Sequence, residues 1–169
     1  MTISHSDKGI ILVDTRQKEG KHDTKHEQII RLGYQLKSQK LDIGDYMLVG
    51  QDRISVDTKK DLTEIYQDVV SDKSRFMREV RRAYDNKVHL YVLVEHGGQI
   101  KNIDDVIKWQ PKYGKVSSRS IREKLFRISI SYGTEFMFCD KRATGRRIIE
   151  ILEGKYERER NYYCNSFNA

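Results

Sequence analysis

The chain has 169 residues, a length that fits one domain by the usual prior of about 100–200 residues. It carries 32 basic and 25 acidic residues, so its formal net charge is +7, and its 34% charged residues exceed the roughly 25% of an average globular protein. Its longest aliphatic runs, at residues 10–13 and 90–94, are far shorter than the ~20 residues of a membrane span, so we expect no membrane association.

The apolar pattern predicts strands that alternate with helices. In the first part of the chain we expect a buried strand over 10–14, a helix over 25–32, a strand over 34–38 and two strands over 46–49 and 54–57. Further along we expect helices over 61–70 and 74–84, a buried strand over 88–95, a helix over 119–132, a strand over 135–139 and a helix over 142–152. The polar residues at 50–53 predict a hairpin loop, so this order predicts an α/β fold with a mixed sheet.

Composition also predicts the organisation and location of the chain. We expect one domain over residues 1–154 and a polar, aperiodic tail over 155–169. The first nine residues lack the apolar stretch of a signal peptide, and Cys139 and Cys164 form no Cys-x-x-Cys pair. We therefore expect a protein of the reducing cytoplasm, without a disulfide framework or a thiolate zinc site.

Positive charge is concentrated late in the sequence. Residues 108–147 contain eleven basic and three acidic residues, and this surplus of eight predicts a polyanionic partner. Trp109 lies shortly before Lys112 and Lys115. We expect it either to stack on an unpaired base or to pack in the core. The candidate DNA contacts are Lys112, Lys115 and Arg119 in this segment and a stripe of Arg75, Arg78 and Arg82 on an earlier helix, which also fits a solvated face.

Three aspartates lie at predicted strand edges: Asp14 after the first strand, Asp45 before the hairpin and Asp57 near its end. Lys59 follows Asp57 by two residues, so both side chains project from one face of the strand. With a loop of about three residues, Asp45 would lie across the hairpin near Lys59, one position along from Asp57, whereas a slip by one residue would turn Asp45 to the other face. Grouped carboxylates repel one another, and Mg²⁺ or Mn²⁺ removes that repulsion. Such a cation activates water for phosphodiester hydrolysis, while a lysine orients the water or neutralises charge.

This spacing alone also fits turn caps and surface charges, but the residues around the aspartates form a longer pattern. It consists of Val13-Asp14-Thr15-Arg16, Gly44-Asp45-Tyr46, Val56-Asp57-Thr58-Lys59-Lys60 and Arg75-Phe76. In order, spacing and strand placement the pattern resembles the XPF-type structure-specific endonucleases of the restriction-endonuclease-like superfamily. The likeness is greatest to small stand-alone bacterial and phage versions, and it covers residues 9–153.

The resemblance implies a mixed-sheet α/β/α fold, a divalent metal, and cleavage of DNA at branches, flaps or recombination intermediates. It implies that Asp45 and Asp57 hold the metal, that Asp14 adds a further acidic residue to that site, and that Lys59 assists the water. Arg16 would face the site or a phosphate. A role in DNA repair or recombination, a location at the nucleoid or in a phage-infected host, and a homodimer are all compatible with the resemblance.

Four positions depart from the family pattern, one of them Thr63, where the family has an aspartate that Asp61 precedes by two positions. Gln17 stands where the family has glutamate, so an outer ligand is either missing or supplied by Glu19. Thr58 replaces an arginine, and Asp57 replaces a glutamate with a shorter carboxylate. These departures motivate an alternative hypothesis, a catalytically decayed DNA-binding module of the same family that positions a partner. A nuclease that acts on RNA is a third hypothesis.

Histidines offer two further candidates. His22 and His26 lie four residues apart, with Asp23 nearby, but no further cysteine or histidine stands at zinc-ligand spacing. We therefore expect a solvated helix start rather than half of a metal site. His96 follows a buried strand and is either a turn residue or a neighbour of the active site.

Overall fold

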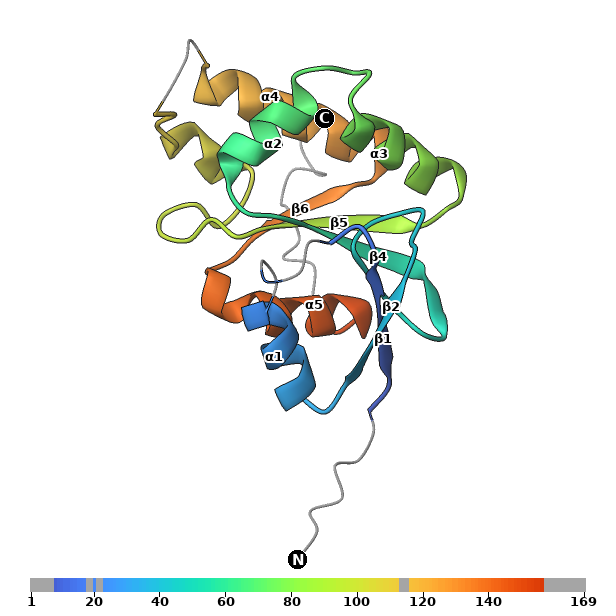
Figure 1. Cartoon of the computed structure of the whole chain (residues 1–169). Coiled ribbons are helices and arrows are strands. Elements are labelled where there is room, and N and C mark those ends of the chain that lie inside the picture. The colour runs from blue at the N-terminus through green and yellow to red at the C-terminus, as the bar shows by residue number, and fades with distance from the viewer. Residues whose placement is uncertain (1–7, 18–19, 21–22, 113–115, 157–169) are drawn as a thin grey trace, which may run out of the picture.

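A six-stranded sheet lies between two layers of helices in the computed structural model, which describes residues 8–17, 20, 23–112 and 116–156 (Figure 1). The strands are β1 Ile10–Asp14, β2 Gln35–Gln39, β3 Tyr46–Leu48, β4 Gln51–Lys59, β5 His89–Val94 and β6 Glu135–Phe138. The helices are α1 Asp23–Arg31, α2 Leu62–Val69, α3 Arg75–Asp85, α4 Ser118–Tyr132 and α5 Thr144–Leu152, with 3₁₀ turns η1 Asp104–Lys108 and η2 Lys141–Ala143. Within these ranges no helix is long and apolar enough to cross a membrane.

The strand order in the sheet is β2-β1-β3-β4-β5-β6. β3 runs antiparallel to both of its neighbours, whereas the β1–β2, β4–β5 and β5–β6 pairs are parallel. The carboxyl ends of β1 and β4 and the amino end of β3 therefore meet at the same edge of the sheet. The mixed α/β sheet expected from the sequence is confirmed.

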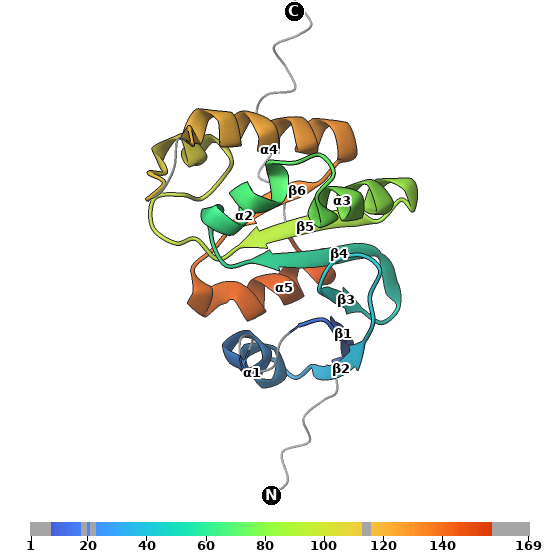
Figure 2. The same cartoon turned by 45° about the horizontal axis from the view of Figure 1, so that its top comes forward.

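The helices form two layers, with α2, α3 and α4 on one face of the sheet and α1 and α5 on the other (Figures 1 and 2). Each layer has its own apolar core, because strand side chains alternate between the faces. Val92 and Leu125 belong to the core under α2–α4, while Val56 and Ile148 belong to the core under α1 and α5. All four side chains are fully buried. Asp61 caps α2 and accepts a hydrogen bond of 2.9 Å from the backbone N–H of Glu64.

The hairpin of β3 and β4 differs from the expected one in its loop, and it contains a bulge. Gln51 and the two residues after it belong to β4, so the expected loop at 50–53 is wrong and the chain turns at Val49 and Gly50. Leu48 pairs with Gln51 and Tyr46 pairs with Val56. Between these two pairs β4 therefore uses five residues where β3 uses two. With this bulge, Asp45 lies beside Thr58, which is one position along from Asp57 and precedes Lys59, so the predicted position of Asp45 is confirmed.

Candidate active site

A pocket of about 300 Å³ opens where the ends of β1, β3 and β4 meet α2 and α3. The predicted catalytic residues Asp14, Asp45, Asp57 and Lys59 all line it. The other lining residues are Arg16, Gln17, Thr58, Glu64, Asp68, Arg75, Phe76 and Glu79. Six of the lining residues are acidic and three are basic, so the pocket carries a formal surplus of three negative charges.

Lys59 occupies the centre of an acidic group at the end of β4. Its Nζ lies 3.0 Å from Oδ2 of Asp57 and 2.8 Å from Oδ2 of Asp68, and it stands 4.9 Å from the centroid of the Phe76 ring. The side chains of Lys59 and Asp57 are 12% and 8% exposed. The prediction that Asp57 and Lys59 share a face is confirmed, and their ion pair is largely shielded from solvent.

Burial and charge shift the pKa values of this ion pair. Burial raises the pKa of Asp57 well above its usual range; Lys59 opposes this effect, and the carboxylates of Asp45 and Glu79 add to it. Burial alone would lower the pKa of Lys59, but Asp57 and Asp68 more than offset it and raise that pKa. Lys59 is therefore an ammonium at neutral pH and acts as a hydrogen-bond donor and a positive charge, not as a base.

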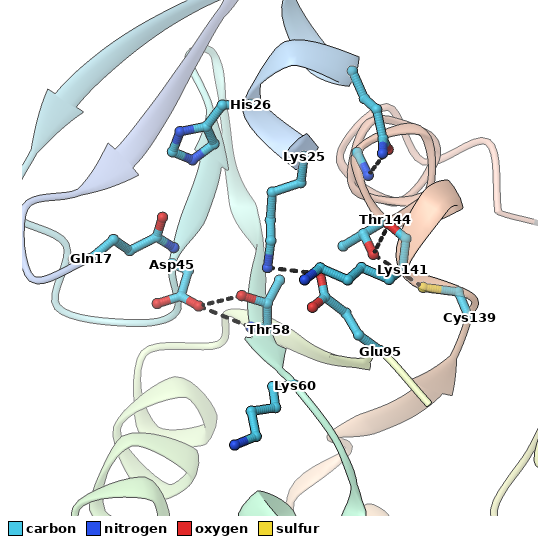
Figure 3. Close-up of polar contacts among 12 residues, drawn as sticks. Gln17, Lys25, His26, Asp45, Thr58, Lys60, Glu95, Cys139, Lys141 and Thr144 are labelled. Atoms are coloured by element: carbon cyan, nitrogen blue, oxygen red, sulfur yellow. Dashed lines mark hydrogen bonds and ion pairs between the residues drawn. The ribbon is translucent and has the colours of Figure 1, made fainter. Parts of the chain in front are cut away.

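Asp45 reaches the pocket from the residue before β3. Its Oδ2 accepts hydrogen bonds from the backbone N–H of Thr58 at 2.9 Å and from the Thr58 hydroxyl at 2.8 Å (Figure 3). Gly44 permits this approach: its φ is +70°, and a Cβ there would lie 2.2 Å from Oγ of Ser55. The backbone N–H of Gly44 also donates to the buried carboxylate of Glu79 on α3. The turn before β3 thus carries Asp45 and binds Glu79, so both carboxylates lie on the same side of the pocket.

Asp14 ends β1 and is held by groups from nearby loops. Its Oδ2 pairs with Nε of Arg16, and its Oδ1 accepts the backbone N–H of Leu41 at 3.1 Å. Arg16 in turn donates from Nη2 to the backbone oxygen of Leu41 at 2.7 Å. Asp14 is buried, and both of its carboxylate oxygens are engaged, so it shapes the pocket wall and tethers Arg16 at the rim.

Gln17 belongs to a second polar group, on the α1 side of the pocket. The Tyr46 hydroxyl donates to Oε1 of Gln17 at 3.1 Å and lies 3.0 Å from Nε2 of His26. Figure 3 shows Gln17 beside Asp45, with His26 on α1 above both. His26 is half-buried against Tyr46, so the expected solvated helix start is wrong for this residue. His22 and Glu19 lie outside the described residues.

A buried ion pair fixes α1 against the sheet next to this group. Nζ of Lys25 lies 2.8 Å from Oε1 of Glu95, which follows β5, and both side chains are less than 8% exposed (Figure 3). Breaking such a pair leaves an unpaired buried charge, so it fixes the position of α1 even where its net contribution to stability is small. His96, the next residue, does not line the pocket. It is a loop residue whose pKa is lowered by burial.

The candidate DNA contacts do not form one surface around the pocket. Arg75 lines the pocket, whereas Arg78 and Arg82 lie outside its lining and donate to the backbone oxygens of Lys73 and Asp42. Lys112 is exposed before α4, Arg119 is exposed in the first turn of α4, and Lys115 lies outside the described residues. Trp109 packs against the core under α2–α4, which favours its core interpretation.

The basic surplus of residues 108–147 is divided between the two layers. α4 covers one face of the sheet and α5 the other, so the segment is not a single positive face (Figure 2). Many of its cations also pair with acidic side chains, several of them from outside the segment. These pairs are Lys108–Asp105, Arg122–Asp104, Lys124–Asp72, Arg142–Asp140, Arg146–Glu150 and Arg147–Glu150. A surplus counted along the sequence therefore overstates the charge available to a polyanion.

The sequence did not predict three acidic residues of the pocket, Glu64, Asp68 and Glu79. They lie on α2 and α3, and no spacing relates them to the β4 aspartate. One signal was present: α2 begins three residues after β4 ends, so its polar face must pass close to the end of that strand. Which side chain reaches Lys59 depends on how the helix is rotated, and the packing of Leu62, Ile65 and Val69 fixes that rotation.

Asp45 and Asp57 are the residues that best fit a divalent cation. Oδ2 of Asp57 is buried, Lys59 is its one polar partner among the described residues, and the pocket around it carries a surplus of negative charge. Over the described ranges, no three histidine, cysteine or acidic side chains converge closely enough to enclose a metal ion. A pair of carboxylates suffices for Mg²⁺, which usually completes its coordination with waters and substrate phosphates.

Comparison with known proteins identifies the family. The family model of the ERCC4 domain matches residues 13–152. A search of curated proteins found no match. The solved structure of XPF from Aeropyrum pernix matches with a TM-score of 0.65 at 19% identity, over 88% of this chain and 66% of that one. XPF from Aeropyrum pernix in complex with DNA matches with a TM-score of 0.66 at 19% identity, over 88% of this chain and 65% of that one.

These matches agree with the geometry of the sheet and the pocket. The chain spans just under two thirds of the length of the two XPF structures, and the likeness confirms the expected restriction-endonuclease-like fold. The ERCC4 model spans most of the chain and includes Asp14, Asp45, Asp57 and Lys59. The chain therefore belongs to the ERCC4 domain family of XPF-type nucleases.

Proposed function

We propose that this protein is a Mg²⁺- or Mn²⁺-dependent endonuclease that hydrolyses phosphodiester bonds of DNA at branched, flapped or recombination-intermediate structures. The observation that carries the proposal is the juxtaposition of Asp45, Asp57 and Lys59 in one acidic pocket at the end of β4. Membership of a nuclease family supports the reaction type, and the pocket supplies the chemical groups that the reaction needs.

Asp45 and Asp57 would hold the metal, with Asp14 and Glu79 adding negative charge around it. When bound, a divalent cation lowers the pKa of a coordinated water and stabilises charge on a phosphoryl oxygen. The three surplus negative charges of the pocket favour the uptake of such a cation.

The protein's own groups would orient the reactants and neutralise charge. Lys59 remains an ammonium, so it donates to the attacking water or to a phosphate oxygen on which charge develops. Arg75 at the start of α3 and Arg16 at the rim are the other cations of the pocket, and they would contact phosphates on either side of the scissile bond.

DNA as the substrate is supported by the structural match to an XPF protein in complex with DNA. Preference for a branch or flap is a prediction from the family resemblance, which the family-model match supports. Self-association and a cytoplasmic location remain predictions from the resemblance and the composition.

The test is cleavage of labelled flap, fork, four-way, duplex and single-stranded DNA, and of matched RNA, with Mg²⁺, Mn²⁺ or EDTA. We expect metal-dependent cutting that is fastest on branched DNA and falls at least about 100-fold in Asp57→Asn. Asp52→Asn, an exposed position on the same strand, serves as the matched control and should cut normally. Cutting that survives in Asp57→Asn would refute the proposal, and DNA binding without any cutting would instead identify a non-cutting DNA-binding module.

A further inference from the structure

We infer that Asp68 is a positioning residue that keeps Lys59 in the pocket when the Asp57 carboxylate turns to a metal ion. This inference rests on the proposed function of the same site. It assigns a role in the reaction to a residue of α2 that lies nine positions beyond Lys59 and outside the family pattern.

The geometry provides Lys59 with three neighbours. Two are the carboxylate oxygens of Asp57 and Asp68, and the third is the face of Phe76, which attracts a cation through its ring electrons. Oδ2 of Asp57 and Oδ2 of Asp68 accept no hydrogen bond from other described groups, so Lys59 is the cation that balances both.

The two carboxylates are not equivalent in the proposed reaction. The oxygen of Asp57 that contacts Lys59 is buried and has no other polar partner among the described residues, so a metal ion held by that oxygen would compete with the ammonium for it. If Asp57 alone held Lys59, loading the metal would release the lysine from the site at which it is needed. Asp68 gives Lys59 a second partner that does not compete for the metal.

The helix that carries Asp68 is well anchored. Ile65 and Val69 on either side of Asp68 are fully buried in the core, and the backbone oxygen of Asp68 accepts a hydrogen bond of 2.5 Å from the Ser74 hydroxyl. Ser74 caps α3, which carries Phe76. The carboxylate and the ring on the two sides of Lys59 are therefore fixed to each other through this contact. A lysine held this way loses little freedom during catalysis, and misplacement of a catalytic group can reduce the rate about 100-fold.

Asp68→Asn preserves the shape of the side chain and removes its charge. We expect kcat for metal-dependent cleavage to fall about 10–100-fold while the KM for DNA changes less than about twofold, because the lost contact acts on Lys59 and not on the DNA. Asp72→Asn is the matched control, since Asp72 follows the same helix, is exposed and pairs with Lys124. It should cut like the wild type.

A double-mutant cycle separates positioning from a structural role. In a Lys59→Met background, Asp68→Asn should cause no further loss, because Asp68 then has no lysine to hold. Asp68→Ser is the second variant if the amide folds poorly. Cleavage by Asp68→Asn at the wild-type rate, or a loss of equal size in the Lys59→Met background, would overturn the inference.

Mn²⁺ binding measured by electron paramagnetic resonance gives a readout that does not depend on cutting. In Asp68→Asn, Lys59 pairs with Asp57 alone, so the Mn²⁺ Kd should rise about threefold or more when Lys59 is present and less than about twofold in Lys59→Met. Equal rises in both backgrounds would contradict the role of Asp68. If the wild type binds Mn²⁺ with this coupling but cuts no substrate, the proposed function fails and the positioning of Lys59 stands.

Discussion

Asp57→Asn should make the protein more stable and inactive at the same time. The carboxylate is 6% exposed, its Oδ2 has Lys59 as its one polar partner among the described residues, and Asp45 and Glu79 repel it. An unsatisfied buried polar group costs about 1–3 kcal/mol, and partial compensation by Lys59 leaves about 1–2 kcal/mol to be relieved by the amide. In a chain of this size, that change corresponds to a rise in Tm of roughly 2–8 °C.

The assay is thermal unfolding in EDTA, followed by a Mg²⁺ titration. Because folding raises the pKa of Asp57, the charged carboxylate destabilises the folded state at neutral pH, and this penalty disappears as the pH falls below the ordinary value of about 3.9. The advantage of Asp57→Asn should therefore be largest at pH 7 and shrink toward pH 4. Mg²⁺ should raise the Tm of the wild type by mass action and leave that of the variant nearly unchanged.

The same experiment can refute this reasoning. If Asp57→Asn has a lower Tm than the wild type in EDTA, the Asp57–Lys59 ion pair stabilises the fold by more than the burial of the Asp57 charge destabilises it. Asp52→Asn should change the free energy of unfolding by less than about 0.5 kcal/mol, as exposed substitutions usually do. A rise in its Tm similar to that of Asp57→Asn would point to a general effect of net charge.

Three further predictions concern packing and DNA affinity. Gly145→Ala should lower the free energy of unfolding in urea by about 1–3 kcal/mol, because its Cβ would lie 2.5–2.6 Å from side-chain and backbone atoms of α1. Unchanged or increased stability would show that α1 and α5 can move apart. Leu125→Ala should cost about 2–5 kcal/mol and the neighbouring exposed Phe126→Ala much less, and similar losses would contradict the assignment of α4 faces. Arg75→Ala should reduce the slope of log Kd for DNA against log salt concentration by about 0.7–0.9. Arg146→Ala on α5 should leave this slope unchanged, and an equal change for both variants would mean that α5 contacts the DNA.

Much of the fold could be predicted because local patterns and packing agree. The apolar run of β5 and the alternation of strands with helices predicted the central sheet, and Asp61 and Ser74 marked the starts of α2 and α3. Asp57 and Lys59 could be placed on one face because side chains in a strand alternate strictly. Each of these features depends on residues that are near one another in the sequence.

The features that could not be predicted depend on distant residues. The bulge between β3 and β4, which places Asp45 beside Thr58, depends on how each strand packs against its other neighbour. Asp68 reaches Lys59 because the core under α2 fixes the rotation of that helix, and the short connection from β4 does not by itself determine that rotation. The division of basic residues between α4 and α5 depends on which face of the sheet each helix covers.

Consecutive side chains of β4 point to opposite faces of the sheet. Val56 fills the core under α1 and α5, Asp57 and Lys59 face α2 and α3, and Thr58 between them holds Asp45. Deleting or inserting one residue within this stretch would turn every following side chain to the opposite face and exchange carboxylate for hydroxyl. During divergence, this strand can therefore change its side chains, as the departures at positions 57 and 58 illustrate, far more readily than it can change its length.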